Sequence, residues 1–126
     1  MLVGVHGSGL NNALFLREGA CVLQVVPFGL RYRGDFEAIA ARNHVEYREL
    51  VLADRTRSVF HWEFLDPVRL VAGKAAVLDA GSPTGGREVY SFWVNQDVVV
   101  PPVEFAAAVR GAAASPLNQR LRPPGK

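Results

Sequence analysis

Apolar residues recur with two different periods along the first fifty positions of the chain. Residues 2–6 and 21–27 are short apolar runs of strand length, and the second is nearly continuous, which is typical of a parallel strand covered on both faces. Between them, residues 10–18 place leucine and alanine at helical spacing, and Gly19 is expected to end that helix. This alternation predicts right-handed βαβ units on a mostly parallel sheet.

The same alternation continues to about residue 52. Residues 35–43 carry one apolar stripe at three- and four-residue spacing, with Asp35 as the expected helix cap, and residues 44–52 are predicted to form a third strand. Beyond it the pattern weakens, since residues 54–66 fit a strand and a packed loop equally well. Residues 103–114 follow two prolines and are predicted to be a helix.

Composition and length indicate one globular piece. The chain has 126 residues, of which 49% are hydrophobic, so we expect a single α/β domain over residues 1–114 and a tail over residues 115–126. The Gly- and Pro-rich stretch at residues 81–86 has the composition of a turn. The net charge of +2 comes from scattered basic residues, a distribution that argues against a nucleic-acid-binding face.

The sequence lacks the residue patterns of a disulfide, a metal site, a membrane span and a signal peptide. Cys21 is the one cysteine, so neither an internal disulfide nor a cysteine-based metal site is expected. His44 and His61 are too isolated in the sequence to be assigned as ligands, and no metal is predicted. No run reaches the apolar length of a membrane span, and no signal peptide is visible at the start of the sequence.

The strongest candidate for chemistry is the turn after the first strand. His6-Gly7-Ser8-Gly9 follows an apolar strand and precedes a helical pattern, an arrangement in which backbone N–H groups can hold an anion such as phosphate. The phosphate-loop motif is absent, and the dinucleotide fingerprint lacks its third glycine. A nucleophile elbow at Ser8 is disfavoured because His6 and Leu10 occupy the positions that require glycine.

A longer series of motifs resembles glycosyltransferase family 61, which includes plant xylan-type transferases and animal protein O-linked N-acetylglucosaminyltransferases. The resemblance is strong over residues 2–50 and patchy over residues 90–114. The matching elements, in chain order, are His6-Gly7-Ser8-Gly9-Leu10-Asn11-Asn12, Leu14-Phe15-Leu16, Gly19-Ala20, the strand from Val22 to Val26 with Pro27 and Phe28, and Asn95-Gln96-Asp97-Val98 with Phe105 and Ala106.

The resemblance implies a fold, a substrate class and a location. The fold would be a Rossmann-like, mostly parallel sheet with flanking helices, as in the C-terminal half of a GT-B glycosyltransferase. The substrate would be a UDP-linked sugar, transferred with inversion to a glycan or glycoprotein hydroxyl, with no cofactor required. The location would be the Golgi or endoplasmic reticulum lumen. The chain is much shorter than family members, so it is interpreted as a fragment.

The resemblance also assigns candidate site residues. Donor contacts are expected from His6, Gly7, Ser8, Gly9, Leu10, Asn11, Asn12 and Gln24, with phosphate contacts from Arg31 and Arg33. Gln24 stands where the family usually has Glu, which keeps hydrogen-bonding capacity but removes a negative charge. The alternative hypothesis is therefore a catalytically inactive, truncated module that binds a nucleotide or a partner. In either case the catalytic residues remain unassigned.

Overall fold

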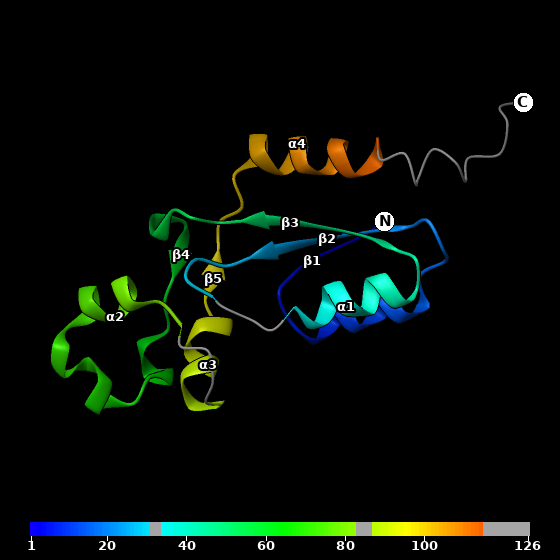
Figure 1. Cartoon of the computed structure of the whole chain (residues 1–126). Helices are drawn as coiled ribbons and strands as arrows, with labels where there is room; N and C mark the ends of the chain where they lie inside the picture. The colour runs from blue at the N-terminus through cyan, green and yellow to red at the C-terminus, as the bar shows by residue number, and fades with distance from the viewer. Residues whose placement is uncertain (31–33, 83–86, 115–126) are drawn as a thin grey trace, which may run out of the picture. The chain divides into compact units, whose positions relative to one another are not determined.

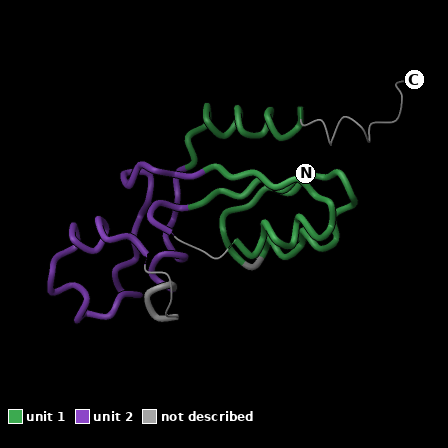
Figure 2. The backbone as a smooth tube through the Cα atoms, viewed as in Figure 1, with its two compact units in different colours: residues 1–26, 34–50, 100–126 green, residues 27–33, 51–99 purple. Residues whose placement is uncertain are grey.

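The chain divides into two compact units, which are coloured separately in Figure 2. The computed structural model describes residues 1–30, 34–82 and 87–114. Unit 1 comprises residues 1–26, 34–50 and the segment from residue 100 onward, and unit 2 comprises residues 27–33 and 51–99. The single domain expected over residues 1–114 stays a prediction, and the two units are described in turn.

Unit 1 is built on a three-stranded parallel sheet with the order β1-β2-β3 (Figure 1). The strands are β1 (Leu2–Val5), β2 (Cys21–Val26) and β3 (Glu46–Val51), which confirms the three strands expected from the apolar runs. In the register of β1 and β2, Gly4 lies opposite Gln24. All six residues of the central strand β2 are buried, as the nearly continuous apolar run predicted.

Helices cover both faces of this sheet, as Figure 1 shows. The 3₁₀ helix η1 (Ser8–Phe15) and the α-helix α1 (Asp35–Arg42) pack on one face, and α4 (Pro102–Ala113) lies against β2 on the other. The core beneath η1 and α1 contains Leu10, Ala13, Ala20, Val22, Phe36, Ala40 and Val45. These features are those of an α/β fold.

Three local expectations differ from the structure of unit 1. The helix expected over residues 10–18 is a 3₁₀ helix that ends at Phe15, where Leu16 N–H donates to Ala13 C=O. Gly19, with a φ of 77°, instead forms the turn into β2 and donates its N–H to His44 C=O at 3.0 Å. Asp35 is the first residue of α1 and not its cap, because the left-handed Gly34 precedes it.

Unit 2 joins a short antiparallel ribbon to several helices. The strands β4 (Ser58–Val59) and β5 (Asp97–Val98) pair with each other, so residues 54–66 are mostly 3₁₀ turns with one two-residue strand. The 3₁₀ helices are η2 (Arg55–Arg57), η3 (Trp62–Phe64) and η4 (Pro67–Ala72), and the α-helices are α2 (Lys74–Ala80) and α3 (Arg87–Val94). Neither α2 nor α3 was expected from the apolar pattern.

An aromatic cluster forms the centre of unit 2. The ring of Phe60 lies within 6.3 Å, centroid to centroid, of Phe28, Trp62, Phe92 and Trp93. Gly29 is required beside it for two reasons: its φ is +69°, and a Cβ at this position would collide with the Trp93 ring. The glycine that opens the loop after β2 therefore serves packing.

Candidate functional site

The glycine bend, residues Gly7–Gly9, lies directly after β1. His6 N–H donates to Val25 C=O at 2.9 Å and so continues the parallel pairing one residue beyond β1. The chain then turns, and η1 begins at Ser8. The bend therefore lies at the carboxyl end of a parallel strand, which is the edge where open α/β sheets bind ligands.

Neither glycine of the bend is required by the structure of the chain itself. Gly7 has a φ of 161°, an extended conformation open to any residue, and Gly9 does not take a left-handed φ. A Cβ at Gly9 would meet nothing within 4 Å, and one at Gly7 would meet only the Val5 carbonyl at 3.8 Å. The missing side chains therefore leave open space beside the backbone, which is the condition for close approach of a ligand.

The start of η1 leaves backbone donors at this open surface. Leu10 N–H donates to Gly7 C=O at 3.0 Å. The N–H groups of Ser8 and Gly9 precede the first turn and have no acceptor within η1, as at any helix N-terminus. Asn12 Nδ2 donates to Gly9 C=O at 2.8 Å and holds the bend against the helix. The result is a short backbone segment that can face an anion.

The remaining predicted residues of the turn fall into two groups. Gly9, Asn11 and Asn12 are exposed, whereas Leu10 is a core residue that is 1% exposed. Leu10 is therefore placed to anchor the bend on the sheet. Arg31 and Arg33, the expected phosphate contacts, lie outside the described residues.

His6 and Gln24, eighteen positions apart in the sequence, meet beneath the bend. His6 is 8% exposed and Gln24 is 0% exposed. Gln24 Nε2 lies 2.6 Å from His6 Nδ1, and Gln24 Oε1 accepts a hydrogen bond from the Tyr47 hydroxyl at 2.8 Å. Gln24 is thus enclosed between His6 and Tyr47, and its side chain has no exposed surface with which to contact a ligand directly.

Burial shifts the pKa values of His6 and Tyr47. It lowers the pKa of His6 from its usual 6.5, and the nearby Asp35 carboxylate only partly offsets the effect. Burial, together with the charge of Glu37, raises the pKa of Tyr47 to about 12. At neutral pH both His6 and Tyr47 are therefore uncharged. The ring of Phe36 contacts His6 edge-on, with centroids 5.3 Å apart.

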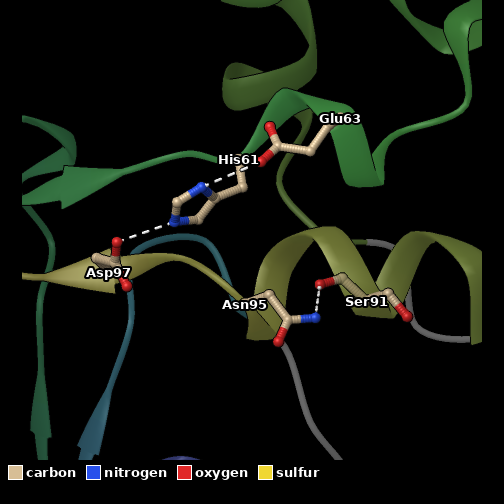
Figure 3. Close-up of polar contacts among 5 residues, drawn as sticks. All are labelled: His61, Glu63, Ser91, Asn95 and Asp97. Carbon is tan, nitrogen blue, oxygen red and sulfur yellow. Dashed lines mark hydrogen bonds and ion pairs between the residues drawn. The ribbon is translucent and has the colours of Figure 1, made fainter.

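Unit 2 contains a second polar cluster, which the sequence analysis did not assemble (Figure 3). His61 Nε2 lies 2.9 Å from Asp97 Oδ2, and His61 Nδ1 lies 3.4 Å from Glu63 Oε1. The hydrogen bond to Asp97 raises the pKa of His61, with the Glu63 charge acting in the same direction. Because a carboxylate lies near each ring nitrogen, protonation of His61 is favoured, and the ring links the start of η3 to β5.

The segment Asn95-Gln96-Asp97, which carried part of the family resemblance, has local structural contacts. Asn95 Nδ2 donates to Ser91 C=O in the last turn of α3 at 2.8 Å (Figure 3). Gln96 Nε2 donates to the carbonyls of Phe28 and Trp93 at 3.0 and 2.8 Å. These contacts tie the two residues after α3 to the end of that helix and to the loop after β2, and they account for the polar residue types of Asn95 and Gln96 without a ligand.

An apolar pocket of about 390 Å³ in unit 2 is the less informative candidate. Its lining includes one charged side chain, Arg69, and is otherwise apolar: Leu65, Ala72, Ala76, Val77, Ala80, Gly81 and Trp93. A ligand site normally combines apolar walls with several convergent polar groups, which these lining residues do not provide. The glycine bend therefore remains the better candidate.

Within residues 1–30, 34–82 and 87–114, no group of three or more His, Cys, Asp or Glu side chains is arranged to hold a metal ion. Over the same residues, the helices are too short or too polar to cross a bilayer. No protein-family model matches the chain, and no curated protein shows significant similarity to it.

Proposed function

We propose that this chain binds the diphosphate of a nucleotide-linked sugar at the glycine bend and forms the donor-binding part of a glycosyltransferase. The observation that carries the proposal is the open space beside Gly7 and Gly9, two glycines that neither backbone conformation nor internal packing requires. A ligand that lies against the backbone accounts for both. The position of the bend after a parallel strand is the usual one for such a ligand.

The chemistry of the bend fits a diphosphate leaving group. The N–H groups of Ser8 and Gly9 are preorganised donors, and the exposed amides of Asn11 and Asn12 add polar contacts beside them. Donors fixed in place favour the charge that develops on a departing diphosphate without reorganisation during the reaction. The resemblance to glycosyltransferase family 61 makes UDP the nucleotide to test, a glycan or glycoprotein hydroxyl the acceptor, and the Golgi or endoplasmic reticulum lumen the expected location.

Inverting transfer needs two roles, and the chain would supply one of them, stabilisation of the departing diphosphate. A base beside the acceptor hydroxyl is also required. His61, which lies near two carboxylates, belongs to unit 2, whereas the bend belongs to unit 1. We therefore expect the chain by itself to bind the donor and to transfer sugar slowly or not at all.

Thermal unfolding with UDP and UDP-sugars tests the proposal. A ligand at one hundred times its Kd stabilises the folded state by about 2.7 kcal/mol, which raises Tm measurably. Gly9→Val places a branched side chain in the open space beside the bend and is expected to abolish the shift. Ala107→Val, an equivalent enlargement at an exposed position of α4, is the control and should retain it.

The outcome that refutes the proposal is equally clear. If neither UDP nor any UDP-sugar raises Tm, or if Gly9→Val retains the full shift, the bend is not the donor site. The alternative, a catalytically inactive binding module, draws support from Gln24, whose uncharged side chain is enclosed between His6 and Tyr47. A Tm shift with UDP-sugars that are never hydrolysed or transferred, even when candidate acceptors are added, would favour that module.

A further inference from the structure

The apolar pocket of unit 2 lies between the helices η4 and α2. Its lining residues run from Leu65 to Trp93, and all of them belong to unit 2. Leu65 and Trp93 are buried and form its deep side. The volume of about 390 Å³ lies in the range of small-molecule sites, which is about 300–1,000 Å³. The pocket is therefore large enough for a small ligand.

The walls of the pocket come from two helices that bury none of their described residues. Ala76, Val77 and Ala80 line it from α2, where their spacing places them on one face of the helix. Helices as short as the seven-residue α2 depend on tertiary packing for their stability. An apolar ligand in the pocket would supply such packing to the exposed face of α2.

Arg69 is the one charged residue among the described lining residues of the pocket. Within the part of the chain that the structure describes, its guanidinium makes no ion pair. The two aspartates that are adjacent in sequence to lining residues have other partners. Asp66 accepts the Val68 N–H at 3.0 Å. Asp79 Oδ1 lies 3.3 Å from Arg55 Nη1. Arg69 is thus available to pair with the charge of a ligand.

We propose that this pocket binds a small monocarboxylate with an unbranched alkyl chain, whose carboxylate pairs with Arg69 and whose chain lies against α2 and Trp93. A single cation on the lining matches a ligand with a single anionic group, and the fork of a guanidinium fits a carboxylate. The apolar walls favour an alkyl chain over a sugar or a nucleotide, whose polar groups would lose water without gaining hydrogen bonds. The site is separate from the glycine bend, which belongs to unit 1.

Titration with octanoate, followed by NMR of the tryptophan indole N–H signals, tests this proposal. The chain has two tryptophans, of which Trp93 lines the pocket, and Trp62→Phe identifies its signal. Octanoate should shift the Trp93 signal until the site is saturated. Since the alkyl chain is buried on binding, the affinity should rise about fourfold for each methylene added between hexanoate and octanoate.

Two pairs of variants test the charge and the position of the ligand. Arg69→Gln should weaken octanoate binding about fivefold, the upper value for an exposed ion pair, and leave 1-octanol binding unchanged. Arg42→Gln removes the same charge from an exposed position in unit 1 and should have no effect. Ala76→Leu fills part of the pocket and should weaken both ligands. Ala75→Leu, at the neighbouring exposed position outside the lining, should bind as the wild type does.

The proposal is overturned if octanoate causes no saturable shift of the Trp93 signal. Equal octanoate affinities of Arg69→Gln and the wild type would also overturn it, as would equal losses in Ala76→Leu and Ala75→Leu. All four substitutions are at exposed positions, so the variants are expected to fold. The titration contains no UDP, and its result is independent of whether the bend binds a nucleotide.

Discussion

Leu10 and Leu14 lie in the same 3₁₀ helix and offer a direct test of how the glycine bend is held on the sheet. Leu10 is 1% exposed and belongs to the core of unit 1, whereas Leu14 is 54% exposed. Leu10 also fills the space above Gly4, where an added Cβ would lie 3.1 Å from Leu10 Cδ2. Leu10→Ala therefore removes a packed side chain directly beneath the candidate site.

The expected cost follows from burial. Truncation of a buried leucine to alanine costs about 2–5 kcal/mol through lost transfer free energy and the cavity left behind. Leu14→Ala changes a mostly exposed side chain in the same helix, and we expect a cost of roughly 0.5 kcal/mol or less. The free energy of unfolding of unit 1, measured by amide hydrogen exchange of β1 and β2, should separate the two variants by about 2 kcal/mol or more.

The two variants also test the link between the core and the bend. Because the Leu10 N–H closes the first turn on Gly7, loss of its side chain should loosen the bend and weaken UDP binding beyond any effect of Leu14→Ala. Equal unfolding costs for the two variants would refute the assignment of Leu10 as the anchor. Unchanged UDP affinity in Leu10→Ala would refute its link to the site.

Two further predictions concern unit 2. The folded-state pKa of His61 is raised, so its contribution to stability is fully present below pH 6.5 and is lost as pH rises through the folded-state value. Asp97→Asn should reduce this pH dependence, with the remainder due to Glu63, as urea unfolding at several pH values would show. An unaltered profile would contradict the pairing with Asp97. Gly29→Ala combines a left-handed φ of +69° with a collision against the Trp93 ring, and each effect costs about 1–3 kcal/mol of folding free energy. Chemical denaturation should show this lower free energy of unfolding. A variant as stable as the wild type would contradict the packing of Trp93 against Gly29.

The sequence was most informative where a local pattern and the final packing agree. The apolar runs of β1 and β2 and the stripe of α1 identified these elements, because strand and helix periods differ. The burial expected of both strands is found in β2 alone, since the residues of β1 are half-buried or exposed. The helix α4, which begins at the second of two prolines, was also expected from the sequence. The expectations failed at η1, where local propensity does not distinguish a 3₁₀ helix from an α-helix.

The helices α2 and α3 were missed because each has only seven or eight residues, and their apolar positions are interrupted by charged residues and do not form a clear stripe in the sequence. Side-chain partnerships were harder still. His61 and Asp97 were each noted in the sequence, but they are 36 positions apart and meet because β4 and β5 pair. No local signal encodes such a contact.

The sequence by itself determined that a glycine-rich turn follows an apolar strand, because the strand run and Gly7-Ser8-Gly9 are adjacent in the chain. Only the tertiary structure decided that the bend is open, that Leu10 is buried beneath it and that Gln24 bonds to His6 and Tyr47. The physical reason is that exposure and hydrogen-bond partners depend on strand register and helix packing. Both bring together residues that the chain keeps far apart.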